Sequence, residues 1–468
     1  MLAAQLTQLD DDAPAGLAEA LAVVDAVDDS LTRGLARLSE PDAAAWTALA
    51  TAVDGTPLAE RTAEAVRAAT TGALTEEHLA VLVGARAALL GAVHDALLDR
   101  LDTALHRSRG PWLAAPSDAA PAPGVTPALA GARAWLHELT LAGWQGADHE
   151  LLSGAAGPVE AALAEPAQRR LAVLLDGLAA ELRAGLPVTA ATPAPARRWA
   201  DLWARAVLLA AGATTETAPA ETVSGRLLPL GVDVHEHDTA FQAQLHALLE
   251  PAGGGPGRLV RVTVVAAKVA TIVGPAGWRL LEAYPVLLKA LAERRAVTVT
   301  DLPAHGADLH WVEERAVLGD PADPFATARV LLAGATASAT PPLQRHPAAL
   351  AEPVLVEGRV VRDDDGEPVV ALDGRTIPLA VDRLPAAGPL TPALVGAATA
   401  CLGLLRWDDG RWLLQPLAVR ATVKRQTVEA HNGDWACGIT DPKAAKAEAR
   451  AGDAVAVLRE RAGRLLRR

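Results

Sequence analysis

The stretch from Val354 to Val423 constrains the fold most strongly, because short apolar runs alternate there with tight-turn signals. An Asp-Gly pair stands between two apolar runs at 365–366, at 373–374 and at 409–410. Glycine accepts the positive φ that a tight hairpin turn needs, so each pair predicts a hairpin. The region therefore predicts a compact antiparallel sheet or a small barrel.

Length and charge bound the remaining possibilities. The chain has 468 residues, which exceeds one typical core and favours two or three domains. Hydrophobic residues make up 51% and charged residues 21%, a balance typical of a folded protein. The formal net charge of −13 argues against a nucleic-acid binder that uses the whole chain. Residues 441–468 carry +4, however, and leave −17 on the rest.

Cysteine usage and apolar run lengths indicate a cytoplasmic protein without membrane contact. Cys401 and Cys437 are too few for a four-cysteine zinc site or a disulfide framework. The N-terminus reaches three consecutive aspartates at 10–12 without the pattern of a secretory signal. The longest apolar runs, such as 206–213 and 394–405, are shorter than a bilayer span.

The predicted fold class is α+β. We predict an all-α helical domain over residues 1–215, a mixed α/β domain over 224–345, a β-rich, small barrel-like domain over 350–440 and a basic C-terminal helix over 441–468. The clearest helix is Thr75–His106, which has apolar residues at spacings of three and four and Thr75 as its N-cap. Trp199 and Trp203 share one helix face and are predicted as core anchors, with a ligand-stacking pair as the alternative.

The middle section is predicted to mix both element types. Its expected elements are the strand Arg226–Val234, the short helix Thr239–Leu249, one or two strands in Arg258–Val273, the helix Gly277–Arg294, the strand Ala296–Thr300 and the helix Pro324–Ala333.

His235 and His237 are the candidate metal ligands. Alternate side chains of a strand share a face, so both imidazoles would reach one ion, with Asp301, His305 and His310 available to complete a site. A metal-dependent hydrolase would follow from such a site. The alternative is a solvated strand end.

Other catalytic signals are weak, and we assign no catalytic residue and no cofactor. The sequence contains neither GxSxG nor GxxxxGK, and the glycine-rich run 253–257 precedes a strand where a phosphate loop would follow one. Cys437 lies near His431 in sequence, which leaves a Cys–His pair open. The balance favours a protein that is not an enzyme.

The β-rich region also carries candidate binding residues. Aromatic and basic side chains on a small barrel would stack bases and follow phosphates, or bind an acidic protein partner. These residues are Trp407, Trp412, Arg420, Lys424 and Arg425. The alternative is a solvated surface beside an amphipathic tail helix.

Two motifs in this region resemble the segment downstream of the zinc finger in bacterial SWIM-type zinc-finger proteins. They are the run from Gly358-Arg359-Val360-Val361 to Ile377-Pro378-Leu379, and the hairpin WDDGRWLLQPL at 407–417. The finger itself, a CxC followed by a CxH, does not occur, so zinc binding is not implied. The resemblance implies an accessory protein that acts beside a MoxR-type AAA ATPase and a partner with a von Willebrand A (VWA) domain.

These observations predict a non-catalytic cytoplasmic scaffold that binds protein partners. The alternatives are a nucleic-acid-binding protein that uses the β-rich domain and the basic tail, and a metal-dependent hydrolase at His235 and His237.

Overall fold

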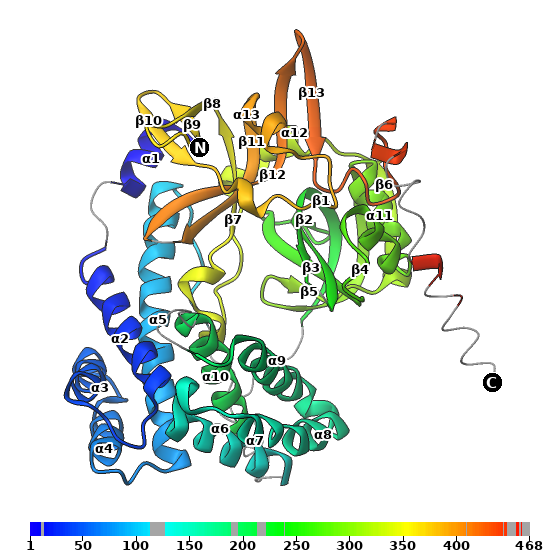
Figure 1. Cartoon of the computed structure of the whole chain (residues 1–468). Coiled ribbons are helices and arrows are strands. Elements are labelled where there is room, and N and C mark those ends of the chain that lie inside the picture. Colours follow the sequence, from blue (N-terminus) through cyan, green and yellow to red (C-terminus); the bar gives the residue numbers. More distant parts are fainter. Residues whose placement is uncertain are drawn as a thin grey trace.

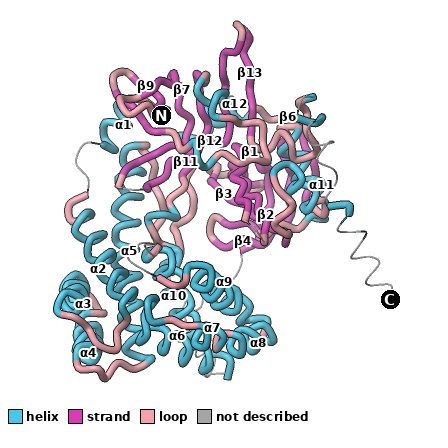
Figure 2. Tube along the Cα trace, viewed as in Figure 1, coloured by secondary structure: helices cyan, strands magenta, loops and turns pink. Residues whose placement is uncertain are grey.

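The structure is a computed structural model of the full chain. It describes residues 1–10, 14–112, 127–188, 195–212, 221–237, 239–408, 410–442, 444–446, 455–457 and 460. A helical unit precedes two β-barrels, which lie side by side at its upper end in Figure 1; Figure 2 shows the same division by element type. The chain is therefore α+β, as predicted.

The helical unit spans the first ten α-helices. They are α1 (Ala3–Asp10), α2 (Leu17–Arg33), α3 (Glu40–Ala52), α4 (Ala59–Thr70), α5 (Glu76–Ala104), α6 (Pro127–Gly146), α7 (His149–Ser153), α8 (Ala156–Ala164), α9 (Arg169–Gly185) and α10 (Ala196–Ala210). Trp199 and Trp203 are buried; the Trp199 ring meets Trp144 edge-on at 6.3 Å, and the Trp203 indole donates a hydrogen bond to Thr140. Both tryptophans anchor the core, as predicted.

Helix α5 joins the helical unit to the barrels. Thr75 caps its start by accepting a hydrogen bond from the backbone N–H of His78, which confirms the predicted cap. By length and composition α5 could cross a membrane, yet 56% of its most apolar window is buried. Its C-terminal half places Leu97 and Leu101 in one hydrophobic cluster with Val356 of the barrel region. The burial explains the apolar composition of α5 through packing.

The first barrel is built from five strands, β1 (Glu221–Glu236), β2 (Ala240–Pro251), β3 (Arg258–Ala267), β4 (Arg295–His305) and β5 (Asp308–Leu309). Strand β1 pairs with both β2 and β4, so the order β1-β2-β3-β5-β4 closes on itself. Strands β3 and β5 are parallel, and η2 (Gly274–Leu281) and α11 (Pro285–Ala292) lie between β3 and β4. This connectivity is that of the OB-fold, a five-stranded Greek-key barrel.

Two predicted elements of this barrel differ from the structure: the single helix expected over Gly277–Arg294 is the 3-10 helix η2 followed by the separate helix α11, and a predicted helix is a strand. Residues Thr239–Leu249 were expected to form a helix and instead form β2. Every second residue of β2 points into the barrel core, from Phe241 through Leu245 to Leu249. The period of two decides the conformation here, although alanine, leucine and glutamine favour helices.

The second barrel repeats the connectivity of the first. Its strands are β7 (Glu352–Glu357), β8 (Arg359–Arg362), β9 (Pro368–Leu372), β10 (Arg375–Pro378), β11 (Ala398–Asp408) and β12 (Arg411–Val423). Strand β7 pairs with β11 and β8 pairs with β9, so β7 and β8 together take the place of β1. A parallel bridge joins Leu379, just after β10, to Leu414 of β12, and α13 (Pro392–Gly396) precedes β11. The predicted small barrel is thus one of two.

A glycine bends the first strand of each barrel. Gly225 lies where β1 passes from pairing with β4 to pairing with β2, and Gly358 separates β7 from β8. A Cβ atom on Gly225 would stand 2.2 Å from the carbonyl oxygen of Glu250, and one on Gly358 would stand 2.5 Å from that of Ala371. Both contacts are with backbone, so only glycine fits.

Three further elements complete the fold: β6 (Ala316–Pro321), α12 (Pro324–Leu331) and β13 (Gln426–His431). Phe325 of α12 lies in a hydrophobic cluster with Leu230 of the first barrel and Leu402 of the second, so α12 packs between the barrels. Residues 335–351, here called the linker, lead from α12 to β7. The predicted helix over 441–468 falls largely outside the described residues.

Candidate functional site

The two barrels meet through a buried polar network. Asp233 of β1 accepts hydrogen bonds from Arg406 of β11 at 2.8 Å and from Gln415 of β12 at 2.7 Å. All three residues are buried. Burial raises the pKa of the Asp233 carboxyl, but the hydrogen bond from His235 and the nearby positive charges outweigh it, and the pKa falls to about 2. The network holds the barrels in register and exposes no reactive group.

His235 and His237 belong to the edge of this network. The Nε2 atom of His235 lies 3.0 Å from the Asp233 carboxylate, and the two imidazole rings stack at 6.5 Å. Across the described part of the chain, no group of three or more histidine, cysteine, aspartate or glutamate side chains is arranged to hold a metal ion. His235 therefore acts in the structure as a partner of Asp233.

Three of the predicted binding residues are engaged within the chain. Trp407 and Trp412 are buried in the core of the second barrel, where their rings meet edge-on at 5.2 Å. Arg420 pairs with Glu429 at 2.6 Å and lies 4.8 Å from the ring centre of Phe325. The two side chains are only 9% and 4% exposed, too little for a base to stack over either ring.

The other two predicted residues stand at the tip of a hairpin. Strands β12 and β13 extend beyond the second barrel as an exposed arm, residues 422–428, which projects from the top of the molecule in Figure 1. Lys424 and Arg425 form its turn with φ of 50° and 66°, and Val423 and Val428 are each 37% exposed. Among the described strands β13 pairs with β12 alone, so its outer edge is open.

A Cys–His pair does not form. Burial raises the pKa of the Cys401 thiol to about 12, and burial is also the main cause that raises the pKa of the Cys437 thiol. His431 is buried, and burial lowers its pKa to about 3. A thiolate nucleophile needs the opposite shift of the thiol pKa, so neither cysteine is activated.

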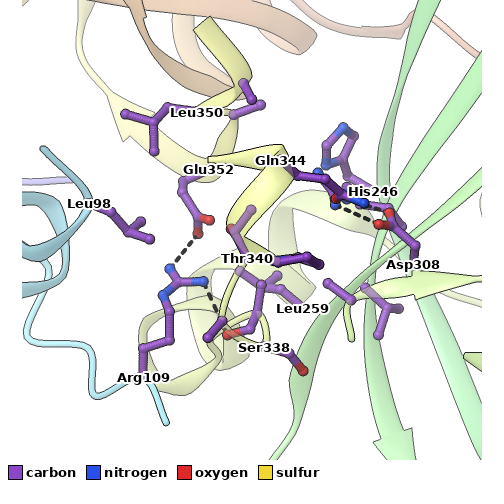
Figure 3. A pocket seen from close by; sticks show the side chains of 18 of the residues that line it. Leu98, Arg109, His246, Leu259, Asp308, Ser338, Thr340, Gln344, Leu350 and Glu352 are labelled. Carbon is purple, nitrogen blue, oxygen red and sulfur yellow. Dashed lines mark hydrogen bonds and ion pairs between the residues drawn. The ribbon is translucent and has the colours of Figure 1, made fainter. Parts of the chain in front are cut away.

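The structure also contains a cavity where all three parts of the chain meet. It measures about 90 Å³ and lies on the outer face of the first barrel. Strands β2, β3 and β5 form one wall, the end of α5 with Arg109 forms a second, and the linker covers it. In Figure 3 Arg109 and Glu352 stand on one side and His246 and Asp308 on the other. Ligands of OB-fold barrels bind on the same strand 2–3 face.

Sequence reasoning missed the residue at the centre of this wall. His246 lies in β2 between two inward-facing residues, Leu245 and Ala247, so its side chain points out of the barrel. The linker and Arg261 leave it only 2% exposed. The interpretation of this segment as a helix concealed the outward position of His246. The available signal was the alternation of apolar and polar residues along 241–247.

Comparisons of the chain with protein-family models, with curated proteins and with solved structures found no match. The resemblance to SWIM-type zinc-finger proteins therefore stays a prediction.

Proposed function

We propose that the protein is a non-catalytic cytoplasmic interaction protein that binds a protein partner through the arm. The observation that carries this proposal is the form of the arm: two strands leave the barrel, expose Val423 and Val428, and end in the basic pair Lys424-Arg425. Exposed valines and an unpaired strand edge are unfavourable in water and are covered when a partner binds, so they are typical of an interaction surface.

The partner expected from this geometry adds a strand to β13. In β-strand addition, backbone hydrogen bonds supply affinity and side chains on alternate positions supply specificity. The edge of β13 offers Gln426 and Thr427 beside Val428, and the positive tip favours an acidic segment. The MoxR-type ATPase and the VWA-domain protein implied by the resemblance are the first candidates.

Two networks of buried ion pairs outside the arm have a structural role. Arg86 joins Asp28 of α2 at 2.6 Å and Asp201 of α10 at 2.8 Å. Arg109 joins Asp102 at 2.9 Å and Glu352 at 3.3 Å. Each network ties separate elements together, which is the use expected of a scaffold.

Binding to the purified candidate partners tests the proposal. The variant Lys424→Glu/Arg425→Glu and the variant Val428→Asp are expected to lose binding while they keep the wild-type circular dichroism spectrum. The control is Arg359→Glu/Val361→Asp, which combines one charge reversal and one valine-to-aspartate change on the exposed strand β8. Equal binding by the wild type and both arm variants contradicts the proposal.

A nucleic-acid partner is the second candidate, favoured by the OB connectivity and by Lys424 and Arg425 at the tip. Binding of a single-stranded oligonucleotide should then fall steeply with salt, and Lys424→Glu/Arg425→Glu should reduce the slope by about two counterions. Binding that is absent at low salt removes this candidate.

A further inference from the structure

The cavity on the first barrel contains a buried polar atom that the chain does not satisfy. The Nε2 atom of His246 has no hydrogen-bond partner among the described residues. Burial and the charge of Arg261 lower the pKa of His246 to about 3, so the ring is neutral at physiological pH. Buried polar atoms in native proteins nearly always have a partner, so the partner of His246 has to come from outside the described residues.

The charged groups of the cavity wall are already paired with one another. Arg261 and Asp308 form two hydrogen bonds, at 2.8 and 2.9 Å. On the opposite side Arg109 is shared between Asp102 and Glu352. An ionic ligand would have to break one of these pairs, whereas an uncharged ligand leaves them intact.

The other residues that line the cavity favour a ligand that carries hydroxyl groups. Neutral side chains of the linker, Ser338, Thr340 and Gln344, line the cavity together with the apolar surface of Leu98 and Leu259 (Figure 3). A neutral imidazole nitrogen either donates or accepts according to tautomer, and a hydroxyl serves both cases. Apolar carbons of the same ligand would contact the two leucines.

Size sets the upper limit on the ligand. A water molecule requires about 10–15 Å³ when cavity volume is measured with a sphere of the size of water. A cavity of about 90 Å³ therefore holds several waters or one organic molecule of roughly six non-hydrogen atoms. From these observations we infer that the cavity binds a small uncharged polyol, with one hydroxyl bonded to His246 and the others to the linker.

Such a ligand would contact the helical unit through Leu98, the first barrel through His246 and the linker through Thr340. It would therefore stabilise the arrangement of these parts without touching the arm. The inference is independent of the proposed partner, because Lys424 and Arg425 do not line the cavity.

Three probes of similar size test the ligand class on the full-length protein: glycerol, the cation of 3-amino-1,2-propanediol, and glycerate. Titrations followed by the imidazole ¹⁵N resonance of His246 should saturate with glycerol. The cation and the anion should bind at least about tenfold more weakly, because each disturbs a paired charge. A response that is linear in all three probes overturns the inference, as does tighter binding of either ion.

Variants locate the site. His246→Phe is expected to abolish the saturable rise of the melting temperature with glycerol and to leave only the linear rise that polyols give every protein. Ser338→Ala/Thr340→Val, on the linker, should weaken glycerol binding by about tenfold or more. His431→Phe is the matched control, since His431 is also buried with an unpartnered Nε2 but lies outside the cavity. Unchanged glycerol binding by His246→Phe and by the linker variant contradicts the proposed site.

Discussion

Asp233 of the first barrel and Arg406 of the second form an ion pair of 2.8 Å in which both side chains are buried. The pair is joined by Gln415, which donates to the other carboxylate oxygen of Asp233. Since each residue belongs to a different barrel, their relative position is fixed by a contact between residues 173 positions apart in sequence.

Removing one member of this pair should destabilise the protein strongly. Asp233→Ala leaves Arg406 buried without its counter-ion, and we expect the free energy of unfolding to fall by about 3–5 kcal/mol. Urea denaturation measures the change. Glu250→Ala is the control, because it removes the exposed pair with Arg226 and should cost less than about 1 kcal/mol. A loss for Asp233→Ala no larger than that of the control would show that the pair is not buried in solution.

Asp233 also predicts a loss of stability in acid. Its pKa is about 2 in the folded protein and 3.8 ordinarily, so the unfolded chain binds the proton first as pH falls. The stabilisation is complete above about pH 4 and is lost progressively toward pH 2, with a magnitude on the order of 2 kcal/mol. Urea denaturation at several pH values should show this decline in the wild type, and Asp233→Asn should weaken it.

His246 and His431 predict a separate decline at higher pH. Burial lowers the pKa of each from 6.5 to about 3, so between these values only the unfolded chain carries the extra protons. The free energy of unfolding should fall from pH 6.5 to pH 4 by on the order of 3 kcal/mol for each histidine. In His246→Phe/His431→Phe this decline should be largely absent, and an identical slope in both proteins would contradict the neutral buried state.

The two bend glycines should be intolerant of alanine. Gly225→Ala and Gly358→Ala each place a Cβ atom within 2.5 Å of a carbonyl oxygen, and we expect losses of about 2 kcal/mol or more. Gly84→Ala on α5 is the control with open space around the added methyl, and it should stabilise the protein by about 0.5–1 kcal/mol. Thermal unfolding monitored by circular dichroism ranks the three variants.

The two cysteines should differ in reactivity. Cys437 is exposed, whereas Cys401 lies in the core and has its pKa raised to about 12. Iodoacetamide at pH 8 should therefore modify Cys437 in the folded protein and reach Cys401 only after denaturation, as measured by peptide mass spectrometry. Modification of Cys401 under native conditions would indicate that the second barrel opens.

The sequence predicted the features that depend on neighbouring residues alone, namely a helix cap and a hairpin turn. Thr75 caps α5 because its hydroxyl reaches the backbone three residues ahead, and the pair Asp373-Gly374 turns because both residues take positive φ. The closure of each barrel has no such signal. It depends on the pairing of β1 with β4 and of β7 with β11, across at least forty residues of intervening chain, which one sequence does not specify.

The cavity was beyond sequence reasoning for the same reason. Its lining comes from α5, from the first barrel and from the linker, and no motif connects Leu98, His246 and Thr340. Trp407 and Trp412 illustrate a different difficulty. Aromatic residues beside a hairpin turn are equally consistent with an exposed surface for base stacking and with a pair buried in the core. Burial separates the two readings, and burial is a property of the whole fold.

Strand β12 leads from Gln415, at the contact with Asp233, to Val423 at the base of the arm's turn, with one bulge against β11 at Leu417. These eight steps cover about 27 Å of extended backbone. A pull applied at the turn would load both strands of the hairpin, and along β12 the force would reach the contact between the two barrels.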